Sequence, residues 1–213
     1  YPARFSPVFV ASAIEAFSPP GNVILDPYMG GGTTVVEAMA RGRTAIGCDL
    51  NSLAVFVTSA KTTPLTKSEA RQVKKWAIEI VPLLSYHTVT DEVAELVCPD
   101  RTRNLNLPRA RPVKKLIAQA LLTLTELPSD RTRNFARCVL LNVAQWALNN
   151  RKVAPSLLQV RGKVATATED MLAGLEALSK TVADQGGQPC IPRLIHATAA
   201  DLPCYEPFTT GTK

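Results

Sequence analysis

The sequence predicts an α/β fold in which a small parallel sheet with its covering helices is interrupted by a large all-helical insertion. Short apolar runs alternate with helical patterns over residues 1–65, which is typical of strands joined by crossover helices. Residues 66–185 carry long amphipathic patterns and almost no strand signal. A strand pattern then returns in the sequence PRLIHATAADLP, so the predicted α/β core is discontinuous and comprises residues 1–65 and 186–213.

The first part of the core reads as helix, strand, helix, strand, helix. Residues 7–17 have helical apolar spacing, and the sequence SPPGN ends this helix before a short buried strand at 23–26. Residues 33–42 are predicted as a helix with Gly42 as its stop, 44–50 as a second strand and 51–62 as a third helix. Because a helix joins the two strands, we expect them to be parallel with a right-handed crossover.

The insertion is predicted to hold four helical regions. They comprise residues 66–81, 111–127, 129–150 and 155–187. Thr66 is a candidate N-cap for the first region, and Ser129 or Asp130 for the third. Gly186 and Gly187 end the fourth.

Composition limits the class of protein. The chain has 213 residues, a formal charge of +6 and five cysteines, none of them in a C-x-x-C pair. The basic charge fits a polyanionic partner. The odd cysteine number and the lack of a secretory leader predict reduced thiols in a cytoplasmic protein. His87 and His196 stand far from any cysteine pair, so we expect no metal site, and no apolar run approaches the roughly 20 residues of a membrane span.

The most informative stretch is VILDPYMGGGTT, residues 23–34. A strand that ends in Asp26 and runs through a glycine-rich turn into a helix predicts a nucleotide-type site, and Asp49 at the end of the next strand can bind ribose hydroxyls. Three details argue against a dinucleotide. The usual third glycine is missing, Asp26 would repel a pyrophosphate, and Pro27 stiffens the strand exit. A carboxylate there suits a positively charged amino group, which favours S-adenosylmethionine.

The segment DPYMGGGTT resembles the Asp-Pro-Phe-x-Gly-Ser-Gly-Thr-Thr motif of the DNA amino-methyltransferases, which make N6-methyladenine or N4-methylcytosine. The resemblance covers residues 1–65 well, 190–203 weakly and the insertion hardly at all. It implies a partial Rossmann-like S-adenosylmethionine-dependent methyltransferase sheet, with DNA as the partner.

The resemblance also implies roles for single residues. Asp26, Pro27 and the loop backbone would hold the methionine moiety of the cofactor. Thr33 and Thr34 would cap the next helix and contact its carboxylate, while Asp49 would bind the ribose and Leu50 and Asn51 would flank the adenine. Phe5 would pack near the methionine end, or else serve as a core aromatic. The full set of expected cofactor-binding residues is Phe5, Asp26, Pro27, Tyr28, Gly30, Gly31, Gly32, Thr33, Thr34, Asp49, Leu50, Asn51, Thr198 and Asp201.

Thr198 and Asp201 mark a departure from the family pattern. The family usually has Gly-Asp-Ala ahead of Asp-Leu-Pro at the end of the third strand, and its first Asp reaches the adenine amino group. Here Ala-Thr-Ala stands at 197–199 and Asp-Leu-Pro at 201–203. Either the hydroxyl of Thr198 or the carboxylate of Asp201 is expected to substitute, or else cofactor affinity is lower.

The catalytic motif of the family, Asp/Asn/Ser-Pro-Pro-aromatic, is missing. Ser18-Pro19-Pro20-Gly21 lacks the aromatic residue, and Glu206-Pro207-Phe208 has no strand ahead of it. We therefore expect no catalytic residue in this chain, which alone would be inactive. Both ends look like cuts in something longer, and a second polypeptide or a missing C-terminal part is expected to carry the motif.

The sequence Asp-Arg-Thr-Arg-Asn occurs twice, at 100–104 and 130–134, within a basic region. It marks either two helix starts with Asp as cap or two loops whose arginines, Arg101, Arg103, Arg131 and Arg133, contact phosphate. DNA is the expected partner. An RNA N2-guanine-type methyltransferase and a non-catalytic S-adenosylmethionine-binding subunit are the alternatives, and an NAD dehydrogenase is a distant one.

Overall fold

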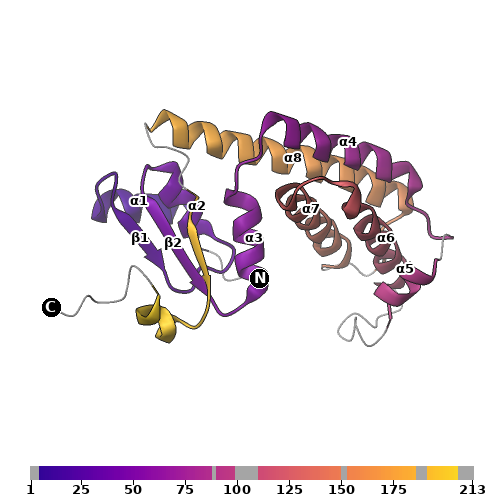
Figure 1. Cartoon of the computed structure of the whole chain (residues 1–213), viewed down its shortest axis with the longest axis horizontal. Helices are drawn as coiled ribbons and strands as arrows, with labels where there is room; N and C mark the ends of the chain where they lie inside the picture. Colours follow the sequence, from indigo (N-terminus) through magenta and orange to yellow (C-terminus); the bar gives the residue numbers. More distant parts are fainter. Residues whose placement is uncertain (1–4, 88–89, 99–109, 150–152, 186–190, 206–213) are drawn as a thin grey trace. The chain divides into compact units, whose positions relative to one another are not determined.

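The computed structural model describes residues 5–87, 90–98, 110–149, 153–185 and 191–205. The chain is an α/β protein that divides into two compact units (Figure 1). One, the sheet unit, comprises Tyr1–Pro64 and Gly174–Lys213, and the other, the helical unit, comprises Leu65–Ala173.

The sheet unit is built on three parallel strands, β1 (Val23–Asp26), β2 (Thr44–Asp49) and β3 (Arg193–His196), in the order β1-β2-β3. In this register Leu25 pairs with Ile46, and Asp49 pairs with His196. The predicted parallel arrangement of the first two strands is confirmed.

Three helices complete the first part of this unit, α1 (Pro7–Phe17), α2 (Thr33–Ala40) and α3 (Ser52–Thr62). Helix α2 ends as expected at Gly42, where the N–H of Gly42 donates to Met39 and the N–H of Arg43 donates to Ala38. This pair of bonds is a Schellman motif, and it turns the chain directly into β2.

Each face of the sheet carries its own apolar cluster. On one face Val35 and Met39 of α2 pack with Val10 and Ile14 of α1 and with Val182. On the other face the cluster consists of Ile46, Cys48, Ile195 and Leu202, of which Leu202 belongs to the short helix η3 (Ala199–Cys204).

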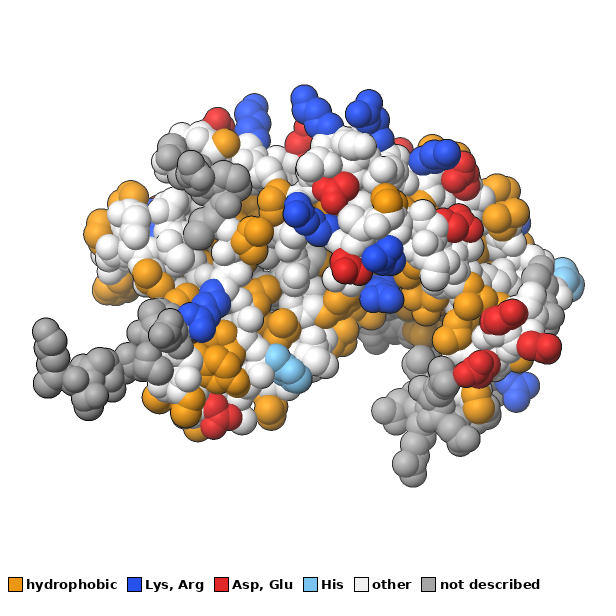
Figure 2. All heavy atoms as spheres, viewed as in Figure 1, with side chains coloured by type: hydrophobic (Ala, Val, Ile, Leu, Met, Phe, Trp, Pro, Cys, Tyr) orange, Lys and Arg blue, Asp and Glu red, His pale blue; other side chains and the backbone are white. Residues whose placement is uncertain are grey.

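Strand β1 lies at an edge of the sheet, and its outward-facing side chains are poorly covered. Val23 and Leu25 are 57% and 40% exposed, and orange hydrophobic side chains are visible on the surface of the sheet unit in Figure 2. Parallel sheets normally have both faces covered, so this face of the sheet is unusually bare at β1.

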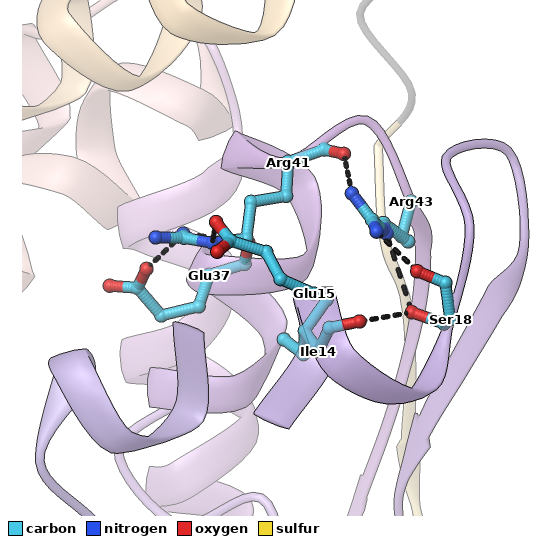
Figure 3. A network of polar contacts seen from close by, with 6 residues as sticks. All are labelled: Ile14, Glu15, Ser18, Glu37, Arg41 and Arg43. Atoms are coloured by element: carbon cyan, nitrogen blue, oxygen red, sulfur yellow. Dashed lines mark hydrogen bonds and ion pairs between the residues drawn. The ribbon is translucent and has the colours of Figure 1, made fainter. Parts of the chain in front are cut away.

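A polar network joins α1, α2 and the start of β2 (Figure 3). The buried guanidinium of Arg43 donates to the carbonyl oxygens of Ser18 and Arg41 and to the Ser18 hydroxyl. The neighbouring Arg41 forms ion pairs with Glu15 and Glu37. The network therefore holds the end of α1 against the turn that leads into β2.

The helical unit contains the predicted helices and one short helix that the sequence does not predict. Its elements are α4 (Lys67–Leu83), α5 (Asp91–Leu96), α6 (Ala110–Leu122), the 3₁₀ helix η2 (Thr123–Glu126), α7 (Asp130–Leu148) and the first part of α8 (Leu157–Asp184). Helix α5 is the addition. Thr66 caps α4 as expected, and Ser129 rather than Asp130 caps α7. No helix among the described residues is long and apolar enough to cross a membrane.

Candidate functional site

The two strand-end aspartates lie at the same edge of the sheet. Because β1 and β2 are parallel, their carboxyl ends meet, and Asp26 pairs with Gly47, two residues before Asp49. The N–H of Met29 donates to the carbonyl of Cys48 at 3.0 Å, so the chain that leaves β1 passes over the end of β2. The predicted residues from 26 to 34 and from 49 to 51 are thereby brought together at the edge where open α/β sheets bind ligands.

Asp49 connects β2 to the glycine loop, the turn of residues 27–32. One carboxylate oxygen accepts the N–H of Gly30 at 2.9 Å, and the other accepts the N–H of Asn51 at 2.8 Å. Asp49 does not cap the next helix, because Asn51 is the N-cap of α3 and accepts the N–H of Leu53 at 2.9 Å. Asp49 thus fixes the loop from the neighbouring strand.

Asp26 makes a local turn at the exit of β1. Its carboxylate accepts the N–H of Tyr28 at 3.1 Å, and the side chain of Tyr28 points largely to solvent, with 78% exposed. The second oxygen of Asp26 takes no part in this bond, so the carboxylate retains acceptor capacity beside the loop.

Helix α2 starts differently from the expectation. Its N-cap is Gly32, which has φ 77° and ψ 24°, and no side-chain cap bond is present. The prediction that Thr33 and Thr34 cap the helix is therefore wrong: both are in its first turn. A left-handed residue at the cap is possible because glycine has no Cβ, and it leaves the first N–H groups of the helix without side-chain acceptors.

Two glycines allow close packing around the loop. A Cβ at Gly32 would lie 2.5 Å from the hydroxyl of Thr58, and a Cβ at Gly47 would lie 2.5 Å from the sulfur of Met29. At Gly30, by contrast, a Cβ would meet only the Tyr28 carbonyl at 3.9 Å. The loop is thus packed tightly against α3 and β2 on one side and has free space at Gly30.

Helix α3 supplies two loop contacts that the sequence analysis missed. The ammonium group of Lys61 donates to the carbonyl of Gly31 at 2.8 Å, and the hydroxyl of Thr58 lies 3.5 Å from the carbonyl of Gly30. Both side chains are three residues apart and therefore on one face of the helix. The isolated Gly47 within a strand was a usable signal for close backbone approach, but nothing in the sequence marks Lys61.

The third strand brings its predicted residues to the same edge. The N–H of Ala197 donates to the carbonyl of Asp49 at 3.2 Å, and a ring nitrogen of His196 lies 3.0 Å from the Leu50 carbonyl. Beyond the strand, the hydroxyl of Thr198 donates to the carboxylate of Asp201 at 2.9 Å. The two residues that were alternatives for one role thus form a pair.

Phe5 and Cys48 have different surroundings, the first exposed and the second buried. Phe5 is 67% exposed and stacks on Phe9 with ring centroids 6.1 Å apart, so the alternative that it is a core aromatic is wrong. Burial raises the pKa of the Cys48 thiol, which donates to the Ala197 carbonyl. A buried thiol of this kind is a poor nucleophile.

None of the described cysteines, Cys48, Cys98, Cys138 and Cys204, forms a disulfide. Among the residues that the structure describes, no group of acidic, histidine and cysteine side chains could hold a metal ion.

The predicted nucleic-acid-binding arginines divide into two groups. Arg101 and Arg103 lie outside the described residues. Arg131 is exposed, whereas Arg133 donates to the Leu127 carbonyl at 2.6 Å and to Asp130 at 2.8 Å. Arg133 therefore stabilises the start of α7. Exposed basic side chains also line α4, namely Lys67, Arg71, Lys74 and Lys75, and blue Lys and Arg side chains are visible on the helical unit in Figure 2.

The segment that contains the glycine loop is also similar to known proteins. Residues 1–58 match the family model described as DNA methylase. The chain is 38% identical to the type II methyltransferase M.MvaI of Kocuria varians over 72 residues. This segment covers 32% of the chain and 16% of that protein. The chain is 30% identical to the type II methyltransferase M.MjaII of Methanocaldococcus jannaschii over 81 residues. This segment covers 38% of the chain and 15% of that protein.

A third relative, the type II methyltransferase M.ScaI of Streptomyces caespitosus, is 40% identical over 50 residues, which cover 24% of this chain and 16% of that protein. The chain thus spans about a sixth of the length of the curated relatives it matches. No solved structure matches it significantly. Residues 1–58 are thus similar to the DNA methylase family and to curated type II methyltransferases.

Proposed function

We propose that the sheet unit is the cofactor-binding part of an S-adenosylmethionine-dependent DNA amino-methyltransferase with a partial Rossmann-like sheet. The observation that carries the proposal is the arrangement of Asp26 and Asp49 on either side of the glycine loop, with Asp49 bonded to the N–H of Gly30 at 2.9 Å. Two carboxylates beside bare backbone suit a ligand with a positive amino group and a positive sulfur, and would repel a diphosphate.

The site residues fit this cofactor. The free space at Gly30 allows a ligand to approach the backbone, and the first turn of α2 offers N–H groups to a carboxylate. In the proposal Asp26 takes the amino group and Asp49 the ribose, while the exposed Leu50 and the cap residue Asn51 flank the adenine. When bound, the cofactor supplies a methyl group on a positively charged sulfur. The residues of this chain bind and orient it.

The remaining predicted residues have secondary roles in the proposal. Phe5 lies exposed ahead of α1, where it can cover the methionine end of the cofactor. Thr198 and Asp201, which are hydrogen-bonded to each other, would act together near the adenine amino group. Pro27, Tyr28, Gly31, Gly32, Thr33 and Thr34 would contribute through the loop and the first turn of the helix.

Calorimetric titration tests the cofactor assignment. We expect S-adenosylmethionine and S-adenosylhomocysteine to bind the wild-type chain, and Asp26→Ala and Asp49→Ala each to weaken binding at least tenfold. Asp170→Ala removes an exposed carboxylate of the helical unit and should leave binding unchanged. The assignment fails if both site variants bind like the wild type.

We further propose that the part carrying the catalytic motif docks on the edge of β1, whether it is a second polypeptide or a C-terminal part. Two features of β1 support this: it is an edge strand to which another strand can pair, and its Val23 and Leu25 are exposed on one face, where the connecting helix of an added strand would cover them. The catalytic part, identified by a Pro-Pro-aromatic motif in the same or the neighbouring gene, should produce methylation when it is supplied. Leu25→Asp should prevent this. Leu158→Asp, at a residue 79% exposed in the helical unit, should not.

The helical unit is proposed to contact DNA, or else the partner polypeptide. Arg131 is the best-supported contact because its side chain is exposed, and Arg101 and Arg103 carry the same sequence pattern. In a duplex-binding titration at several salt concentrations, Arg131→Ala should reduce the slope of log K against log salt by about 0.9 for one lost phosphate contact. An unchanged slope would show that Arg131 makes no phosphate contact.

A further inference from the structure

We propose that Lys61 is a positioning residue of the cofactor site, which clamps the peptide group between Gly31 and Gly32 and so holds the cofactor's amino-acid end. The inference rests on the proposed function of the sheet unit. It adds a residue of α3 that the glycine-loop motif does not contain.

The peptide between Gly31 and Gly32, like the one between Gly30 and Gly31, is not constrained by any side chain of its own residues. Neither residue has a Cβ, so the backbone can adopt both signs of φ on each side of this peptide. A rotation of the whole peptide plane would exchange the directions of its carbonyl and its N–H group. Such a peptide needs external contacts to keep one orientation.

The structure supplies contacts at both ends of this peptide. Its carbonyl accepts the ammonium group of Lys61 at 2.8 Å, and its N–H donates to the Met29 carbonyl at 2.8 Å. The Lys61 bond carries a full charge and is the stronger type of hydrogen bond. Thr58, one turn earlier on α3, lies against Gly32 so closely that a Cβ there would approach its hydroxyl to 2.5 Å.

The clamped peptide immediately precedes the first turn of α2. Gly32 is the N-cap of this helix, so the orientation of its preceding peptide sets the direction in which the first N–H groups point. These groups, with the positive end of the helix dipole, are the natural partners of a carboxylate. Lys61 also adds a positive charge beside the loop. Its loss should therefore weaken binding of ligands that carry the methionine carboxylate.

A pair of ligands separates this role from a general structural one. S-adenosylhomocysteine carries the amino-acid end, and 5′-methylthioadenosine lacks it. In calorimetric titrations Lys61→Met should bind S-adenosylhomocysteine about tenfold more weakly, as expected for one charged hydrogen bond, and should bind 5′-methylthioadenosine within twofold of the wild type. Lys61→Arg keeps a charged donor and should restore most of the affinity.

Lys180→Met is the matched control, because it removes the same charge from an exposed lysine of the same unit. Its affinity for both ligands should equal that of the wild type. Unchanged binding of S-adenosylhomocysteine by Lys61→Met, or an equal loss for both ligands, would overturn the inference. A wild-type chain that binds neither ligand would instead refute the proposed function, on which this inference depends.

Discussion

Gly32 is required both by the backbone conformation of the loop and by the packing around it. Its φ is 77°, a value that costs an L-residue about 1–2 kcal/mol, and the Thr58 side chain occupies the position of a Cβ. We expect Gly32→Ala to lower the free energy of unfolding by about 2–4 kcal/mol, because strain and overpacking both act. Urea denaturation followed by far-UV circular dichroism measures this.

Gly174→Ala provides the comparison for Gly32→Ala. Gly174 lies within α8, and a Cβ there would meet nothing within 4 Å. Alanine is favoured over glycine in a helix by about 1 kcal/mol, so this variant should be neutral or more stable. Equal destabilisation by both variants would contradict the proposed origin of the Gly32 effect.

Arg43 is the buried charged residue of the network in Figure 3, with 8% of it exposed. Its guanidinium binds two carbonyls and one hydroxyl, and Arg43→Ala would leave these acceptors unpaired. We expect a loss of about 3 kcal/mol in the free energy of unfolding. Arg43→Lys should recover only part of this, since an ammonium group lacks the planar fork.

Arg193→Ala serves as a control for Arg43→Ala in the same chemical denaturation experiment. Arg193 is an exposed arginine of β3, and its removal should change stability by no more than about 0.5 kcal/mol. If Arg43→Lys were as stable as the wild type, the forked geometry would have no energetic importance.

At the scale of elements, Glu69 couples the starts of two helices. It completes the capping box of α4 by accepting the N–H of Thr66 at 2.9 Å, and it accepts the hydroxyl of Ser129, the N-cap of α7, at 2.9 Å. These bonds, that of Thr66 above all, hold the pKa of Glu69 below its ordinary value. The ionised side chain therefore stabilises the folded helical unit.

Glu69→Gln tests this coupling through its pH dependence. Since the pKa is lower in the folded state, the stabilisation by Glu69 is full above the unfolded pKa of about 4.3 and is lost as the pH falls through the folded value. At pH 7 the variant should be less stable by about 1–2 kcal/mol, and the difference should shrink towards pH 3. Tryptophan fluorescence during urea titration reports it.

Glu79→Gln on the same helix provides the reference for Glu69. Glu79 forms only an exposed ion pair with Lys75, at 3.6 Å, and such pairs contribute about 0–1 kcal/mol. Its substitution should have little effect at either pH. A pH-independent loss in Glu69→Gln would show that the charge of Glu69 is unimportant.

Helix ends that were predicted from neighbouring residues in the sequence are confirmed. Thr66 and Ser129 precede periodic apolar patterns, and each proved to be an N-cap because the cap bond lies within a few residues of chain. Gly42 ends α2 for the same reason. The short helix α5 was missed because its six residues are too few to show a period.

The common location of Asp26 and Asp49 was predicted from the sequence, whereas the bonds within the candidate site were not. Asp26 and Asp49 could be assigned to one edge because parallel strands align their ends. The predicted cap of α2 was wrong because the left-handed Gly32 is the N-cap, and Thr58, which excludes a Cβ there, lies 26 residues away in the sequence. Lys61 lies 30 residues from Gly31, and contacts of this kind depend on the packing of α3 rather than on any local pattern.

At the scale of the whole molecule, tryptophan fluorescence reports on one of the two units alone. Both tryptophans, Trp76 and Trp146, belong to the helical unit, whereas the proposed cofactor residues belong to the sheet unit. Each unit has its own buried apolar residues. A ligand that binds only the folded sheet unit should therefore stabilise that unit alone.

Thermal unfolding with saturating S-adenosylmethionine tests this separation. At a ligand concentration of 100 times Kd the stabilisation is about 2.7 kcal/mol, which for a unit of this size raises Tm by roughly 10 °C. We expect this shift in part of the far-UV circular dichroism transition, to which both units contribute, and none in the tryptophan fluorescence transition. Asp49→Ala should lose the shift. If the fluorescence transition moved equally, helix α8, which runs from one unit into the other, would transmit the stabilisation, and the chain would unfold as one cooperative body.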